Sequence, residues 1–114
     1  FFVRDGVISL HMFQRSGDVP IGVPQNIAQY AALLMMMAQA TDNKPGTLVH
    51  TISDAHIYVD QVPAVKKILD REPRPFPTMK LASNETDIFK FRIEDFELSD
   101  YNPHPGIKKI PVAI

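Results

Sequence analysis

Residues 14–26 carry the densest group of chemically useful side chains in this sequence. Arg15 offers a planar fork of donors suited to a phosphate or carboxylate, Ser16 a hydroxyl, and Asp18 an acceptor. Asn26 adds an amide with a donor edge and an acceptor edge. Two glycines and two prolines in the same span favour a loop with a fixed path and room for a ligand. The stretch is therefore either a binding loop or a long connection in which Asn26 only caps the next helix.

A second polar group lies in residues 47–60, which are typical of a long strand. Period two places Asp54, His56 and Tyr58 on one face. Either Asp54 orients His56 within a structural network, or His56 and Tyr58 face a ligand and donate to a sugar or other hydroxyl. A metal site built from His50 and His56 is disfavoured, because they are six residues apart on a strand and no third ligand is evident.

Both groups need elements that hold them in place, and the hydrophobic pattern supplies these. Residues 1–3 and 7–15 are typical of strands, and the Asp5-Gly6 pair between them is a strong hairpin signal. The more apolar face of the second strand carries Ile8, Leu10, Met12 and Gln14. Residues 26–41 are apolar nearly all round and rich in strong helix formers, which predicts a buried central helix.

The second half of the chain is predicted to contain smaller elements. An amphipathic helix begins at Val62, the alternating prolines of residues 71–77 form a rigid extended connector, and residues 78–81 form a strand. The chain ends on Val112, Ala113 and Ile114. Because mobile tails are usually polar, this apolar end is expected to dock, either permanently or as a lid over a filled site.

Composition excludes several classes of protein. The chain has 114 residues, 45% of them hydrophobic, which is enough for one small globular domain. A formal net charge of −1 gives no global field that would attract DNA or an anionic membrane. No cysteine is present, so these residues contain no disulfide, thiolate metal site or thiol nucleophile. No apolar run spans a bilayer and no signal peptide opens the chain, so a cytoplasmic setting is expected.

Five motifs, in this order and at this spacing, resemble the C-terminal part of the thymidylate synthase family: QRSGDVPIGVPQNIAQYA, DAHIY, REPRPFP, FRIEDFELSDYNPHPGIK and PVAI. The resemblance covers essentially the whole chain. It implies that residues 1–114 are the C-terminal part of a single domain. The implied fold is α+β, with a large twisted mixed sheet packed against a buried central helix. It further implies a cytoplasmic homodimeric methyltransferase that converts deoxyuridylate (dUMP) to thymidylate (dTMP), with 5,10-methylenetetrahydrofolate as co-substrate and no metal.

The resemblance also implies a role for individual residues. The dUMP-binding residues would be Arg15, Ser16, Gly17, Asp18, Asn26, His56, Ile57 and Tyr58. Of these, Arg15 and Ser16 would hold the phosphate, Asn26 the N3 and O4 edge of uracil, and His56 and Tyr58 the 3′-hydroxyl. Asp18 and Ala113 would contact the folate. Because cytosine reverses the hydrogen-bonding edge that Asn26 reads, an Asn at this position favours uracil.

The catalytic nucleophile of the family is a cysteine in a Pro-Cys-His motif, and this sequence contains none. The motif is expected shortly before Phe1, where a strand already in progress suggests a fragment. The fragment alone is expected to be inactive, with Asn26 and Asp18 assisting catalysis in the full protein. Two alternatives remain open at this point: a deoxyuridylate hydroxymethylase with the same site, and a noncatalytic nucleotide-binding module.

Overall fold

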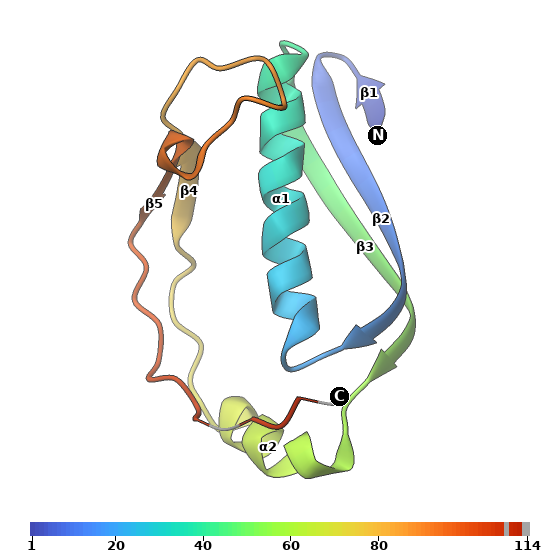
Figure 1. Ribbon diagram of the computed structural model, residues 1–114, viewed down its shortest axis with the longest axis vertical. Helices are drawn as coiled ribbons and strands as arrows, with labels where there is room; N and C mark the ends of the chain where they lie inside the picture. The colour runs from blue at the N-terminus through green and yellow to red at the C-terminus, as the bar shows by residue number, and fades with distance from the viewer. Residues whose placement is uncertain (109, 113–114) are drawn as a thin grey trace.

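The structure, a computed structural model, describes residues 1–108 and 110–112 and has a single long helix, α1 (Gly22–Ala40), at its centre. Figure 1 shows α1 lying across one face of a strand layer, with a separate pair of strands on its other flank. The fold is α+β, as the sequence predicted. The helix therefore lies between the strand layer on one side and the separate pair of strands on the other.

The main sheet is mixed and contains β1 (Phe2–Arg4), β2 (Val7–Asp18) and β3 (Lys44–His56), in the order β1-β2-β3. β1 pairs with β2 in antiparallel fashion through a tight turn. Both central turn residues have positive φ, 51° for Asp5 and 74° for Gly6, so the predicted hairpin is confirmed. β2 and β3 are parallel, and α1 provides the crossover between them.

The predicted polar loop is largely absent, and its residues belong to regular elements. β2 continues to Asp18 and α1 begins at Gly22, so only residues 19–21 connect them. Parallel pairing with the end of β3 extends β2, and local turn signals do not reveal such pairing. Pro24 is tolerated in the first turn of α1, where backbone N–H groups have no intrahelical partner. Asn26 lies inside the helix, so the hypothesis that it caps the helix was wrong.

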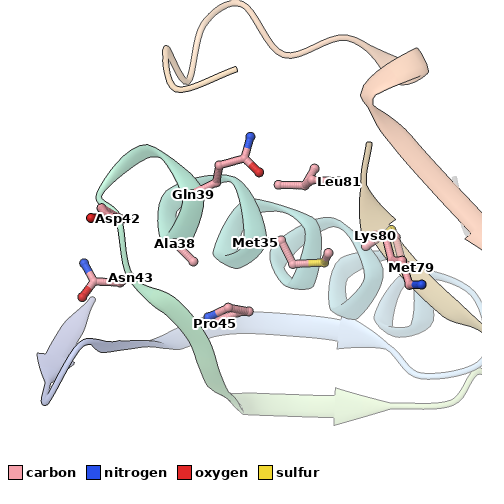
Figure 2. A pocket seen from close by; sticks show the side chains of 9 residues that line it. All are labelled: Met35, Ala38, Gln39, Asp42, Asn43, Pro45, Met79, Lys80 and Leu81. Atoms are coloured by element: carbon pink, nitrogen blue, oxygen red, sulfur yellow. The ribbon is translucent and has the colours of Figure 1, made fainter. Parts of the chain in front are cut away.

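The core lies where α1 crosses β2. Its buried residues are Ile8, Leu10, Leu34 and Ala38, with Tyr30, Leu33, Met37 and Leu48 packed against them. The helix is central, as predicted, but only Leu34 and Ala38 of its side chains are buried. One reason is a cleft of about 510 Å³ beside its C-terminal half, which faces β4 (Thr78–Leu81) (Figure 2). The prediction of a helix buried all round was therefore too strong.

The remaining elements are short. They are η1 (Val59–Gln61), α2 (Val62–Leu69), η2 (Ile93–Asp95) and β5 (Phe96–Ser99), which pairs antiparallel with β4. The predicted helix from Val62 and the predicted strand over residues 78–81 are confirmed. The strand predicted over residues 47–60 begins earlier and ends at His56, so Tyr58 follows the strand instead of belonging to it.

The segment after β5 returns along the proline-rich connector toward the ends of β2 and β3 (Figure 1). Arg71 donates to the carbonyl of Pro105 at 2.9 Å, and Arg74 donates to those of Asn102 and Pro103 at 3.2 and 2.8 Å. The connector is therefore a clamp for the C-terminal segment as well as a spacer. The expected docking of the apolar end falls partly on Ala113 and Ile114, which lie outside the described residues.

Candidate functional site

The polar residues singled out from the sequence gather where β2 and β3 end and α1 begins. Ser16 and Asp18 come from β2, Asn26 from the second turn of α1, and His56 from the end of β3. In α/β units, ligands bind beyond the carboxyl ends of parallel strands, and this group occupies that position. The structure thus unites two groups that are far apart in the sequence.

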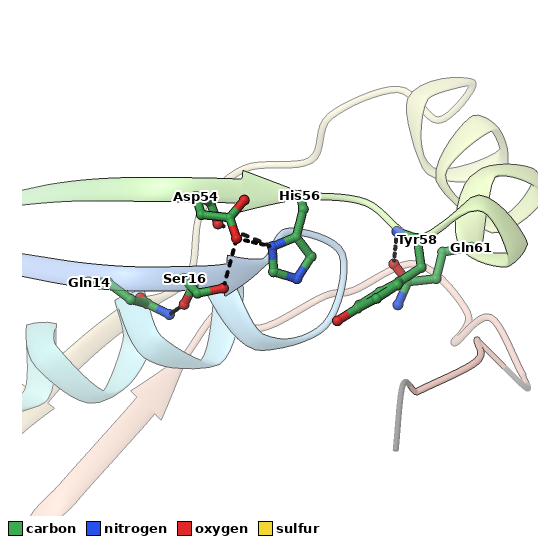
Figure 3. Close-up of polar contacts among 6 residues, drawn as sticks. All are labelled: Gln14, Ser16, Asp54, His56, Tyr58 and Gln61. Carbon is green, nitrogen blue, oxygen red and sulfur yellow. Dashed lines mark hydrogen bonds and ion pairs between the residues drawn. The ribbon is translucent and has the colours of Figure 1, made fainter.

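Asp54 connects the two strands (Figure 3). Its Oδ2 atom accepts a hydrogen bond from Ser16 Oγ at 3.3 Å and lies 3.6 Å from His56 Nδ1. The same His56 Nδ1 lies 3.1 Å from the Asp54 carbonyl oxygen, an acceptor only, so Nδ1 carries the proton. In the neutral ring Nε2 is then an acceptor. Asp54 is placed where it can orient His56.

His56 and Tyr58 form an aromatic pair on the same side of the chain (Figure 3). Their ring centroids are 5.0 Å apart and the ring planes meet at 80°, an edge-to-face arrangement. Ile57 between them is 44% exposed and Tyr58 is 40% exposed. A hydroxyl both donates and accepts, so a ligand hydroxyl could donate to His56 Nε2 and accept from the Tyr58 phenol.

The Asn26 amide is oriented by Gln14, a residue that sequence reasoning assigned no role. Gln14 Nε2 donates to Asn26 Oδ1 at 3.0 Å and to the Ser16 carbonyl at 2.8 Å. His50 Nε2 lies 2.8 Å from Gln14 Oε1, so both polar atoms of the Gln14 amide have partners. One lone pair of Asn26 Oδ1 is thereby used, which leaves the Nδ2 donors and the second Oδ1 lone pair for other partners. The sequence did contain a signal for the role of Gln14: it follows apolar residues on the same strand face, and a partly buried amide there needs hydrogen-bond partners.

Asp18 is half-buried and held at both oxygens. Oδ1 accepts the Ile21 backbone N–H at 3.2 Å, and Oδ2 accepts Gln61 Nε2 at 2.8 Å. A Cβ atom added to Gly22 would lie 3.9 Å from Asp18 Cβ and 3.8 Å from Asn26 Oδ1, so the carboxylate and the amide flank this glycine. Gln61 was not identified from the sequence, where it resembles any polar residue before a helix.

Arg15 and Gly17 differ in surroundings although they share a strand. Arg15 is exposed, and within residues 1–108 and 110–112 no acceptor binds its guanidinium. Gly17 is buried, and a Cβ atom added there would lie 2.9 Å from Val23 Cγ2, closer than real contacts allow. Gly17 therefore lets the start of α1 approach the end of β2, whereas Arg15 leaves a full charge available at its edge.

Comparison with known proteins identifies the family to which the chain belongs. The family model described as thymidylate synthase matches residues 1–114. The chain belongs to the thymidylate synthase family. It is 51% identical over 108 residues to thymidylate synthase of Saimiriine herpesvirus 2 (strain 11), covering 95% of this chain and 37% of that protein. It is 49% identical over 108 residues to thymidylate synthase of varicella-zoster virus (strain Dumas), covering 95% of this chain and 36% of that protein.

Membership in the thymidylate synthase family confirms the resemblance drawn from the motifs, and with it a methyltransferase family. The chain spans just over a third of the length of these two relatives. The roles of single residues stay predictions. Ala113, predicted to contact the folate, lies outside the described residues.

Two features of the described part of the chain concern metal-binding groups and helices that could cross a membrane. No group of three or more His, Cys, Asp or Glu side chains within residues 1–108 and 110–112 could hold a metal ion. Over the same residues, every helix is too short or too polar to cross a bilayer. The candidate site offers one guanidinium, two carboxylates, the Asn26 amide, two hydroxyls and an imidazole as hydrogen-bonding groups.

Proposed function

We propose that this chain forms the nucleotide-binding part of a thymidylate synthase, a methyltransferase that converts dUMP to dTMP. The one-carbon unit and the reducing hydride both come from 5,10-methylenetetrahydrofolate, which leaves as dihydrofolate. The observations that support this most directly are the oriented amide of Asn26 near the start of α1 and the His56–Tyr58 pair at the end of β3. Together they offer the hydrogen-bonding pattern that the uracil edge and a sugar hydroxyl require.

The nucleotide would be bound along the ends of β2 and β3. Asn26 Nδ2 would donate to uracil O4 while Oδ1 accepts the N3 proton, and Gln14 fixes that orientation. His56 and Tyr58 would bind the 3′-hydroxyl, with Ile57 placing them. At the other end, the exposed Arg15 would pair with the phosphate, assisted by Ser16 and by the backbone at Gly17 and Asp18.

Asp18 fits a role toward the folate. A carboxylate offers about four lone-pair positions, and described residues use two of them, through Ile21 N–H and Gln61 Nε2. The remaining positions can accept N–H groups of a pterin ring, which presents such donors. Ala113 would close over the folate from the C-terminal end, as the family resemblance implies.

The chemistry requires a thiolate that attacks uracil C6, and none of the 114 residues is a cysteine. We propose that the complete protein supplies it, that residues 1–114 alone are inactive, and that they form part of one domain. As attack proceeds, negative charge develops on uracil O4, where the Asn26 Nδ2 donors would stabilise it. Asp18 would assist by holding the folate against the base.

We also propose that the protein is a cytoplasmic homodimer with neither DNA nor a membrane as partner. The sheet face opposite α1 supports association, because Phe13 is 67% exposed and Val49 46% exposed there. His11 and Thr51, joined by a 2.9 Å hydrogen bond, lie beside them. The net charge of −1 offers no field for nucleic acid or anionic lipid.

The test is calorimetric titration of the protein, expressed from its complete reading frame, with dUMP, deoxycytidylate and deoxyuridine. Selective binding of dUMP is the expected result, and equal affinity for dUMP and deoxycytidylate would contradict the role of Asn26. Addition of 5,10-methylenetetrahydrofolate should then yield dTMP and dihydrofolate. Formation of 5-hydroxymethyl-dUMP would identify a hydroxymethylase instead, and binding without any product would identify a noncatalytic module.

A further inference from the structure

Gln61 is the only large side chain that is completely buried in the described part of the chain. It is the last residue of η1 and precedes α2, whereas Val59, the first residue of the same turn, is 89% exposed. A polar side chain that enters the interior from a surface turn loses its water contacts, so it requires protein partners. The position of Gln61 is therefore defined by what it binds.

Every polar atom of the Gln61 amide has a partner. Nε2 donates to Asp18 Oδ2 at 2.8 Å and to the Pro111 carbonyl oxygen at 2.9 Å. Oε1 accepts the Tyr58 backbone N–H at 3.0 Å, and the Gln61 N–H donates to the Tyr58 carbonyl at 3.0 Å. One buried amide thus joins three segments: the end of β2, the C-terminal segment, and the turn at Tyr58.

We infer that Gln61 is a positioning residue that fixes the Asp18 carboxylate and the C-terminal segment relative to each other. An amide nitrogen has two N–H donors at a fixed angle, so one side chain sets both partners at once. This inference rests on the proposed folate role of Asp18. It predicts that Gln61 determines folate affinity without contacting the folate, and that it has little effect on dUMP.

Gln39 provides a matched control. Its Nε2 atom also donates two hydrogen bonds, in this case both to backbone carbonyls, Ser83 O at 3.0 Å and Glu85 O at 2.6 Å. Gln39 lies near the C-terminal end of α1, away from Asp18 and Asn26. Gln39→Met and Gln61→Met each delete two amide donors and preserve side-chain length. A purely structural role would give both variants similar stability losses and no difference in ligand affinity.

The test compares wild type, Gln61→Met and Gln39→Met in the protein expressed from its complete reading frame. For Gln61→Met we expect folate affinity, measured with dUMP bound, to fall about tenfold, as loss of a charge-assisted hydrogen bond implies. The dissociation constant for dUMP should change less than about twofold. Gln39→Met should keep both affinities. Equal folate affinity in the two variants would overturn the inference.

A ligand-free measurement separates this inference from the proposed function. Trypsin cleavage after Lys108, near Pro111, is followed by mass spectrometry and normalised to cleavage after Lys90. The normalised rate should rise several-fold in Gln61→Met and stay unchanged in Gln39→Met. An unchanged rate in Gln61→Met would overturn the inference even if folate binds. If wild type binds neither dUMP nor folate, the proposed function fails, whatever the cleavage rates show.

A second variant covers the case in which Gln61→Met does not fold. Gln61→Glu has the same shape and keeps the acceptor for Tyr58 N–H, but it replaces both donors with an oxygen that faces Asp18 Oδ2 and the Pro111 carbonyl. It should show the same selective loss of folate affinity and the same faster cleavage after Lys108. Wild-type values for both quantities in a folded Gln61→Glu protein would contradict the inference.

Discussion

The two ends of α1 sit in opposite chemical environments. At the N-terminal end, Asn26 and the neighbouring Asp18 are held by hydrogen bonds from Gln14 and Gln61. At the C-terminal end, Met35 faces Met79 and Leu81 across a cleft of about 510 Å³ (Figure 2). Fixed polar groups preorganise a site, whereas flexible methionines fill space with little directional demand. One helix therefore has fixed polar groups at its N-terminal end and a cleft lined by methionines at its C-terminal end.

This contrast predicts that substitutions at the two ends differ in kind as well as size. At the N-terminal end, single changes should alter ligand affinity or selectivity, because each group there has a defined partner. At the C-terminal end, changes should alter stability slightly and leave ligands unaffected.

Arg15→Ala should weaken dUMP binding the most. Charge-assisted hydrogen bonds contribute about 1.5 to 3 kcal/mol, which corresponds to a loss of roughly tenfold to a hundredfold. Deoxyuridine, which lacks the phosphate, should bind Arg15→Ala and wild type alike. Arg4→Ala is the control, since Arg4 is exposed at the far end of the sheet. Calorimetry that gave equal losses for dUMP and deoxyuridine would exclude a phosphate role for Arg15.

Gly17→Ala should destabilise the protein by about 1 to 3 kcal/mol, the usual cost of forcing extra volume into a packed region. The added methyl would meet Val23 Cγ2 at 2.9 Å, which pushes the start of α1 away from β2. Chemical denaturation measures the change. Gly106→Ala is the control because nothing lies within 4 Å of a Cβ atom at that position. Equal stability in the two variants would show that the helix start is not tightly packed.

Asn26→Asp should change which base is preferred. The substitution keeps the acceptor for Gln14 Nε2 but removes the donor for uracil O4, while the carboxylate can accept from the exocyclic amine of cytosine. The ratio of dUMP to deoxycytidylate affinity should fall at least about tenfold, as loss of one buried hydrogen bond implies. Titration of both nucleotides gives the ratio. An unchanged ratio would place Asn26 away from the base.

Much of this arrangement was predictable from the sequence, and the exceptions share a cause. The hairpin at Asp5-Gly6, the helix from Val62 and the strand over residues 78–81 depend on local turn chemistry and periodicity, and all three formed. The prediction of a polar loop was wrong because its first residues pair in parallel with β3 and are therefore part of strand β2. Pairing between segments that are far apart leaves no local signal.

The candidate site followed the same pattern. Asp18, Asn26 and His56 could be named as candidates from residue chemistry and the family motifs, because carboxylate, amide and imidazole side chains are distinctive in a sequence. The structure places them at the ends of β2 and β3 and near the start of α1. The residues that hold two of them, Gln14 and Gln61, were missed as a pair because a glutamine's partners depend on the folded structure. Such contacts join segments that are distant in the sequence, so the sequence alone indicates candidate groups but not the side chains that hold them.

Met79→Leu at the open end of α1 should have the smallest effect. A swap that conserves volume usually costs less than about 1.5 kcal/mol, and beside a cleft the side chain has room to adjust. The midpoint of chemical denaturation should shift slightly, and dUMP and folate affinities should match wild type. A loss of either affinity would show that the two ends of α1 are coupled, because the substitution lies on β4, away from the polar network around Asn26. The contrast between the two ends would then describe two parts of one cooperative unit, with strain at the cleft transmitted along the helix to the site.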